Sequence, residues 1–254
     1  MLRTYVADLH VHSALSPCAS YRMAPTEIVR QAIRRGIDIL AITDHNSAEN
    51  VESLVMAAEG SGLRILPGME VETSEEVHLV VIFDSVVSAL QWQEFVYQHL
   101  PSLQNDERVY GVQLVLGPAN QFLHKNTRLL IAPADLNVDA VVAEVNVRGG
   151  FCVPAHVDRP SYSIISNLGF IPDNLDVPAV ELSSNARGPL EQWTGGKEFI
   201  RSSDAHDLSQ IGVSRTMFLL SEPSAREISL ACRRQLGRRV VATKGGARKP
   251  WEYR

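Results

Sequence analysis

Cysteines are scarce in this sequence and long apolar runs are missing, and each scarcity excludes a class of protein. The chain holds three cysteines, Cys18, Cys152 and Cys232, whose spacing does not form a disulfide framework. No apolar stretch approaches the roughly 20 residues that a membrane-spanning helix needs, and the N-terminus lacks the basic-then-apolar pattern of a signal segment. We therefore expect a reduced, cytoplasmic protein that binds no membrane.

An excess of positive charge is also missing. The 24 Lys and Arg residues face 29 Asp and Glu residues, and the net charge of −5 gives no general attraction to nucleic acid. Basic residues gather only in the last two dozen positions, where we expect a solvated tail, with residues 246–254 following a single domain over 1–245. The charge argues against long nucleic acid as a partner. The sequence leaves the oligomeric state open.

Short apolar runs alternate with amphipathic segments along most of the chain. This alternation predicts an α/β fold with a largely parallel sheet, and about seven strand-plus-helix units fit a (β/α)7 barrel better than an open sheet. The segment 84–137 mixes turn signals with short apolar runs, and we expect it to be an elaborated crossover within this single domain. The predicted strands cover 5–9, 37–43, 64–67, 77–83, 151–154, 179–182, 199–202 and 216–220.

Imidazoles and carboxylates collect where these predicted strands end, which is where barrels carry their chemistry. His10 and His12 stand two apart and therefore project from one side of a strand. Most of the eight histidines fall at such positions, and this clustering predicts a multinuclear metal site. The candidate residues at strand ends are His10, His12, Asp44, His45, Glu70, His156, Asp204 and His206.

His78 stands near the start of its apolar run and needs a separate argument. If the segments 64–72 and 77–83 form a hairpin, the antiparallel pairing brings the start of the second strand beside the end of the first. Glu70 and His78 then become neighbours. Glu70 would occupy a position from which its two oxygens could bridge two ions.

Five motifs give the chain its resemblance to the polymerase and histidinol phosphatase (PHP) metallophosphoesterases. They begin at Asp8, Ile42, Pro67, Ala155 and Ser203, reading DLHVHS, ITDH, PGME, AH and SDAH. The resemblance implies a distorted seven-stranded barrel that binds two to three divalent ions, Zn, Mn or Fe. It implies a first ion on His10, His12, Glu70 and Asp204, a second on Glu70, His78 and His156, and part of a third on His45 and His206.

The sequence departs from the family pattern at Pro17 and Cys18. Family members usually carry an Asp or His there as a further ligand of the third ion. Cys18 either ligates as a thiolate, which would favour a softer ion such as Zn, or is a thiol beside a weak or empty third site. We expect Asp44 to orient His45 or an adjacent ligand through a hydrogen bond.

The proposed ions predict metal-activated hydroxide as the nucleophile that cleaves a phosphate ester. Arg159 and Arg187 are the best placed to bind phosphate oxygens, and Arg22 is a weaker candidate. The leading hypothesis is a phosphatase acting on a phosphomonoester of a small metabolite or nucleotide. Two alternatives stay open: an amidohydrolase-like enzyme that cleaves C–N bonds or esters, and a non-catalytic metal-binding module.

Overall fold

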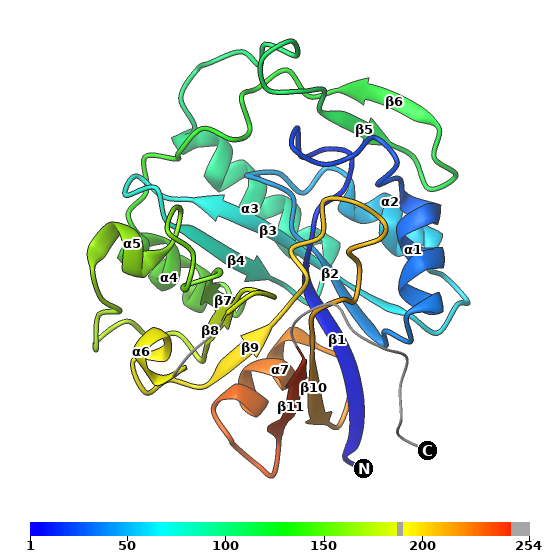
Figure 1. The fold of residues 1–254 in the computed structure, drawn as a ribbon. Helices are drawn as coiled ribbons and strands as arrows, with labels where there is room; N and C mark the ends of the chain where they lie inside the picture. The colour runs from blue at the N-terminus through cyan, green and yellow to red at the C-terminus, as the bar shows by residue number, and fades with distance from the viewer. Residues whose placement is uncertain (187–189, 245–254) are drawn as a thin grey trace.

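A curled seven-stranded sheet forms the wall of the molecule, and a computed structural model describes it over residues 1–186 and 190–244 (Figure 1). The order of the strands across the sheet is β11-β10-β1-β2-β3-β4-β7. Their bounds are β1 Arg3–Val11, β2 Ile39–Ile42, β3 Arg64–Glu72, β4 His78–Ile82, β7 Phe151–Pro154, β10 Arg215–Leu220 and β11 Arg239–Lys244.

A separate parallel pair, β8 (Val180–Leu182) and β9 (Phe199–Arg201), extends this wall towards a barrel. The backbone N–H of Val157, just after β7, donates to the carbonyl of Glu181 in β8 at 2.9 Å. Beyond β9, Ala205 forms a bridge with Val11 at the end of β1. These contacts join β7 to β8 and β9 to β1, so the curled sheet closes round into a barrel, as predicted. The barrel is distorted because each of the two junctions is only a local contact.

The sheet is mixed rather than largely parallel. Strands β1, β2 and β3 run parallel, whereas β4 pairs antiparallel with both β3 and β7, and β10 pairs antiparallel with β1 and β11. The predicted hairpin is confirmed, because β3 and β4 are joined by a short turn with Glu72 opposite His78. That turn sets the register that places His78 at the same end of the sheet as Glu70.

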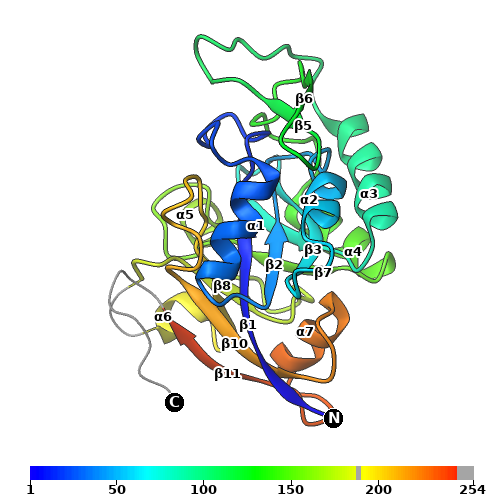
Figure 2. The ribbon, with the colours of Figure 1, turned by 90° about the vertical axis from the view of Figure 1, so that its right-hand side faces the viewer.

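Helices cover one face of the sheet, and a further helix packs near β10 and β11 (Figures 1 and 2). In the first helix Pro25 occupies the first turn, Ile28, Val29 and Ala32 are buried along one side, and Gly36 follows the end with a φ of 67°. The helices are α1 Pro25–Arg34, α2 Val51–Ala57, α3 Val86–His99, α4 Val138–Val147, α5 Ile164–Leu168, α6 Glu191–Thr194 and α7 Ala225–Cys232.

Two apolar clusters fill the fold. The larger joins the covered face of the sheet to α1, α2, α3 and α4, with Trp92 among its fully buried side chains. The smaller lies on alternate residues of the same strands, such as Tyr5, Ala7 and Leu9 of β1, and packs against α7. The C-terminal ends of β1, β2 and β3 are thereby held as a fixed platform.

The connection from β4 to α4 is the elaborated crossover that the sequence predicted. It contains α3 and a small hairpin of β5 (Leu114–Leu116) and β6 (Phe122–Lys125), which Figure 1 shows beyond the ends of β1 and β2. The hairpin is anchored at its base: Asn50, just before α2, donates to the carbonyl of Leu114 and accepts from the backbone N–H of Leu116.

A second expectation, that of a solvated tail over the last two dozen positions, is wrong in part. Residues 239–244 are not solvated tail but strand β11, which pairs with β10. The basic residues before it are neutralised by acidic partners: Arg233 by Asp176 and Arg238 by Glu227. The tail predicted for 246–254 and its boundary at 245 lie outside the residues that the structure describes.

Candidate metal centre

The carboxylate of Glu70 lies at the centre of a cage of imidazoles. Glu70 belongs to β3 and is 1% exposed. Its Oε1 lies 2.8 Å from Nδ1 of His78 and 3.2 Å from Nε2 of His156. Its Oε2 lies 3.3 Å from Nε2 of His12 and 3.2 Å from Nδ1 of His45. Both oxygens of one buried carboxylate therefore face nitrogens that the sequence proposed as ligands.

His10 and His12 project together, as their spacing predicted. Their Nε2 atoms lie 3.2 Å apart. Both also face one oxygen of Asp204, Oδ1, at 3.4 Å from His10 and 3.2 Å from His12. Asp204 follows β9 and has a φ of 51°, a left-handed conformation that non-glycine residues seldom adopt. This backbone turn brings its carboxylate to the end of β1.

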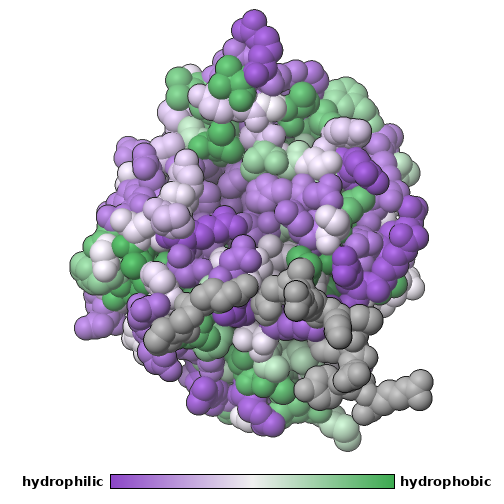
Figure 3. Space-filling model, in the orientation of Figure 1, coloured by the Kyte–Doolittle hydropathy of each residue, from purple (hydrophilic) through white to green (hydrophobic). Residues whose placement is uncertain are grey.

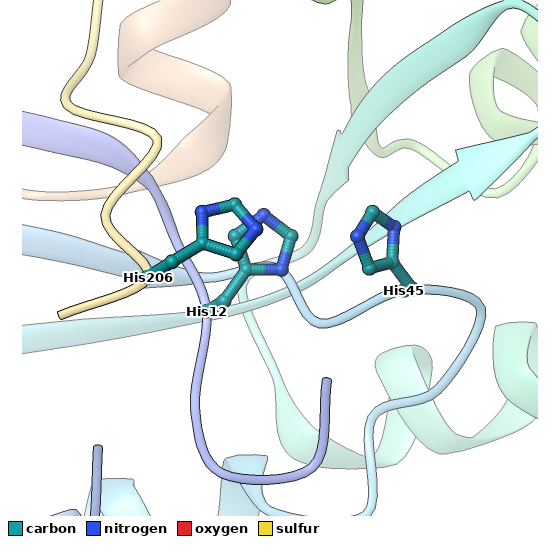
Figure 4. Close-up of side chains that lie close together, drawn as sticks. All are labelled: His12, His45 and His206. Atoms are coloured by element: carbon teal, nitrogen blue, oxygen red, sulfur yellow. The ribbon is translucent and has the colours of Figure 1, made fainter. Parts of the chain in front are cut away.

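His206 completes the group on the other side of His12. Its ring stacks on that of His12 with centroids 4.1 Å apart, and the His45 ring approaches His12 to 4.7 Å (Figure 4). The structure brings ligand atoms within 4.8 Å of one another in three groups: His10, His12 and Glu70; His45, Glu70 and His78; and His12, His45 and His206. These groups overlap at His12, His45 and Glu70, which is the arrangement that closely spaced ions require.

A carboxylate that the sequence analysis missed fixes the orientation of His10. Glu181 in β8 is 2% exposed, and its Oε2 lies 2.8 Å from Nδ1 of His10. The imidazole N–H at Nδ1 donates to this carboxylate, so the Nε2 of the neutral ring carries the lone pair. The only sequence signal is a single charged residue inside the apolar run 179–182.

A second relay fixes His12. The hydroxyl of Ser16 donates to Oδ1 of Asp44 at 2.6 Å, so its oxygen is free to accept from Nδ1 of His12 at 2.9 Å. Asp44 also accepts from the backbone N–H and the hydroxyl of Ser13. Asp44 therefore acts on His12 through Ser16, so a relay of two hydrogen bonds replaces the direct hydrogen bond to a ligand that the sequence predicted.

These relays make the donor set suitable for a metal ion. With Nδ1 of both rings engaged as donors, the Nε2 lone pairs of neutral His10 and His12 point at each other and at the carboxylates of Glu70 and Asp204. Lone pairs converging at 3.2 to 3.4 Å repel unless a cation or proton lies between them. Imidazole nitrogen and carboxylate oxygen are the ligands that Zn, Mn and Fe accept.

The protonation of the cage supports the same conclusion. Burial lowers the pKa of His10, but Glu70, Glu181 and Asp204 outweigh it and hold that pKa well above its ordinary value. Burial likewise lowers the pKa of His78, and Glu70 raises it to about 9. Protons on His10 and His78 thus supply positive charge that balances the negative charge of the buried carboxylates. Bound cations would take over that role and release the protons.

The other rings stay neutral and ready to ligate. Burial lowers the pKa of His45 well below its ordinary value, and it lowers the pKa of His156 as well. Burial, with the nearby His12, lowers the pKa of His206 to about 4. Neutral imidazole is the form that binds metal, so these three residues need lose no proton on binding.

Cys18 stands apart from the cage. Its side chain is exposed, and within the described residues it belongs to none of the three ligand groups. Although part of the residue is exposed, the surrounding chain displaces enough water from the thiol to raise its pKa to about 12, and the charge of Glu70 adds to this effect.

Of the candidate phosphate binders, the structure places Arg159 at the site. Its guanidinium donates to Oδ2 of Asp204, on the side opposite the oxygen that faces His10 and His12, and 43% of its side chain is exposed. Arg22 lies near Asp207, the residue after His206: hydrogen bonds from Ser209 lower the pKa of Asp207, and the charge of Arg22 makes a smaller contribution. Arg187 lies outside the residues that the structure describes. The remaining histidines, His99 and His124, lie away from the cage, bonded to Phe95 and Glu49.

The surface near the site is polar, with an apolar margin. In Figure 3 hydrophilic residues fill the middle of the face, and hydrophobic residues gather towards the top, where Figure 1 places the β5–β6 hairpin. The exposed apolar residues of that segment include Val109, Val112, Phe122 and Leu123. A polar approach to the cage suits a charged substrate.

The fold and the cage together define a metal-binding α/β barrel with its ligands at the strand ends. Residues 8–161 match the PHP domain. The chain belongs to the PHP family, whose members are metal-dependent phosphoesterases. The family resemblance stated from the sequence motifs is thus confirmed.

Two curated proteins share a shorter segment with the chain. A 5′-3′ exoribonuclease from Haemophilus influenzae is 33% identical over 76 residues, which are 29% of this chain and 27% of the relative. A 3′,5′-nucleoside bisphosphate phosphatase from Chromobacterium violaceum is 37% identical over 75 residues, 30% of this chain and 25% of the relative. The matched segments thus span only about a quarter of these relatives.

Among solved structures, the lesion-specific endonuclease from Pyrococcus furiosus has a similar fold. It superposes with a TM-score of 0.73 at 17% identity, over 96% of this chain and 59% of the endonuclease. At this identity the likeness concerns the fold alone. Across residues 1–186 and 190–244, no helix is both long enough and apolar enough to span a membrane.

Proposed function

We propose that this chain is a metal-dependent phosphatase that hydrolyses a phosphomonoester of a small metabolite or nucleotide. The observation that carries the proposal is Glu70, a buried carboxylate whose two oxygens face imidazoles on both sides. A carboxylate in this position can be shared between two ions. Two neighbouring ions would stabilise both the attacking oxygen and the leaving oxygen when the phosphoryl group is displaced.

The ligand assignment follows the two halves of the cage. His10, His12, Glu70 and Asp204 would hold one ion, and Glu70, His78 and His156 a second. His45 and His206, beside His12, would hold part of a third. Such ions, when bound, lower the pKa of coordinated water towards neutrality and so supply a hydroxide nucleophile.

The residues of the chain perform the remaining tasks. Glu181 and Ser16 hold His10 and His12 in the tautomers that present Nε2. The exposed part of the Arg159 guanidinium is free to bind phosphate oxygens while Asp204 holds its other edge. The polar surroundings of the cage admit a charged ester, whereas the net charge of −5 disfavours a long nucleic acid.

The relatives support a phosphoester substrate without fixing its size. One of them is a phosphatase of a nucleoside bisphosphate and another an exoribonuclease. We favour the small ester because the chain shows no overall excess of positive charge. An amidohydrolase-like reaction and a non-catalytic module are the remaining alternatives.

Hydrolysis assays with added Mn or Zn separate these functions. The substrates are p-nitrophenyl phosphate, its phosphodiester analogue, a short oligonucleotide, and an amide or lactone. The proposal predicts release of phosphate from the monoester at the highest rate. Faster cleavage of the oligonucleotide or of the amide would replace it with the corresponding alternative.

Cys18→Ala separates the two alternatives for the third site. If Cys18 stays a protonated thiol, as its raised pKa favours, this variant should bind as much metal as the wild-type protein. Loss of one equivalent of metal would show instead that Cys18 ligates as a thiolate.

A further inference from the structure

Tyr162 is a bulky residue in a backbone conformation that it should avoid. It lies between β7 and α5 with a φ of 55°. For an L-residue with a Cβ the left-handed conformation costs about 1–2 kcal/mol, and bulky residues in it are true outliers. A residue held there by its surroundings points to a functional constraint.

The ring of Tyr162 covers His78, one of the candidate ligands. The two rings are stacked, with centroids 4.8 Å apart and planes at 25°. The backbone N–H of His78 also donates to the carbonyl of Tyr162 at 3.1 Å. His78 is 7% exposed, yet Tyr162 itself is 46% exposed. One face of the tyrosine ring therefore rests on the cage while the remainder is open to solvent.

The loop that carries this ring is fixed at both ends. The hydroxyl of Ser163 donates to the carbonyl of Arg159 at 2.8 Å and closes the turn between them. Further along, the side-chain amide of Asn167 donates to the carbonyls of Glu75 and Glu76 in the β3–β4 turn. Tyr162 is thus an ordered aromatic surface on the same closed turn as Arg159.

We propose that Tyr162 is a stacking platform for a planar ring of the substrate, and that the substrate is a nucleoside monophosphate. This inference rests on the proposed phosphatase function. A compound that reaches both the cage and the platform carries a flat ring joined to its phosphoryl group by a short spacer, as a nucleotide does. Every nucleobase offers a π-face that an aromatic side chain can stack on.

If Tyr162 only shielded His78 from water, neither its exposed ring nor its strained backbone would be explained. An aliphatic side chain would exclude water equally well, and a residue that only shields has no reason to leave its outer face open. Stacking also accounts for the strained backbone, because an aromatic face must be presented at one fixed angle to be useful to a ligand.

The test compares the binding of two non-hydrolysable phosphonates, those of AMP and of ribose 5-phosphate, to the metal-supplemented protein. The platform predicts that the wild-type protein binds the AMP analogue about 5- to 150-fold more tightly, the range of one base stacked on an aromatic ring. Tyr162→Leu, which keeps an apolar cover on His78, should abolish this preference. It should leave binding of the ribose analogue unchanged.

Two further variants serve as controls. Tyr162→Phe retains the ring and should retain the preference. Phe170→Ala removes another exposed aromatic residue from the connection between β7 and β8 and should change neither affinity. Equal binding of the two analogues by the wild-type protein would overturn the platform. So would equal weakening of both analogues in Tyr162→Leu, which would reduce Tyr162 to a cover.

The same measurement keeps this inference separate from the proposed function. Selective binding of the AMP analogue, without hydrolysis of AMP in the presence of Mn or Zn, would refute the phosphatase and leave the platform standing. Hydrolysis of AMP and of ribose 5-phosphate, with no selective binding, would refute the platform alone.

Discussion

Replacing Glu181 by Gln tests whether a buried hydrogen bond controls the first ion. The carboxylate accepts from Nδ1 of His10 at 2.8 Å, and the same oxygen accepts from the backbone N–H of His156 at 3.3 Å. Glutamine has the same shape but no charge. The variant therefore removes the electrostatic support of His10 with little change in packing.

The expected effect is a loss of metal affinity. A neutral acceptor holds the imidazole N–H less strongly and makes Nε2 a weaker ligand, and outer partners of this kind are worth about 10- to 100-fold in affinity, or about 1.4 to 2.8 kcal/mol. The side-chain amide can also turn its NH2 group towards His10, which would disfavour the tautomer that binds the ion.

Titration of the metal-free protein against a chelating indicator measures this affinity. Glu181→Gln should weaken the tightest site by at least tenfold, while Glu52→Gln, a change on the exposed side of α2, should leave it unchanged. An affinity of Glu181→Gln within twofold of the wild-type value would refute the role of Glu181 in orienting His10.

Three further predictions concern other parts of the chain. Arg159→Ala should lower kcat/KM for a phosphomonoester by about 10- to 100-fold, the worth of a hydrogen bond to a charged group, with Arg159→Lys only partly restored because it lacks the guanidinium fork; an unchanged value would exclude phosphate binding. Gly111→Ala places a Cβ 2.3 Å from the carbonyl oxygen of Pro17 at a φ of 102° and should destabilise the chain by about 1–3 kcal/mol, seen as a lower Tm in thermal unfolding; an unchanged Tm would contradict this. Hydrogen bonds from Arg238 lower the pKa of Glu227 from 4.5 to about 2, so its stabilising effect is complete above pH 4.5 and is lost as the pH falls towards 2. Glu227→Gln should cost roughly 1–2 kcal/mol near pH 7 and progressively less as the pH falls from 4.5 towards 2 in urea unfolding; a cost as large at pH 2 as at pH 7 would contradict the assignment.

Local signals predicted the part of the site that strand geometry controls. The spacing of His10 and His12 predicts that both rings project together, and the hairpin predicts that His78 lies beside Glu70, as the structure shows. These predictions succeeded because a strand alternates its side chains and a short antiparallel turn fixes its own register.

The residues that orient the candidate ligands could not be predicted from the sequence. Glu181 meets His10 across 171 positions of the chain, and Ser16 reaches Asp44 only because the loop after β1 folds back over the end of β2. A single glutamate in an apolar strand is a weak signal without knowledge of what it faces. Pairing over such distances is decided by the closure of the barrel.

The segment of strand β11 has the sequence of a solvated tail for a related reason. Its residues alternate weakly and carry positive charge at both ends, Arg239 and Lys244, as a solvated segment would. It forms because β10 offers an unpaired edge, to which the last segment adds in antiparallel register. Basic residues at an edge strand also discourage further pairing with other chains.

The most direct test of the account is the metal content of the purified protein and of Glu70→Gln, measured by elemental analysis after saturation with Mn or Zn and removal of loosely bound ions. A shared carboxylate at the centre of the cage predicts two or more equivalents per wild-type chain, one or fewer in the variant, and hydrolysis of a phosphomonoester only by the former. One equivalent or less in the wild-type protein, with no hydrolysis of phosphate esters, would contradict the account.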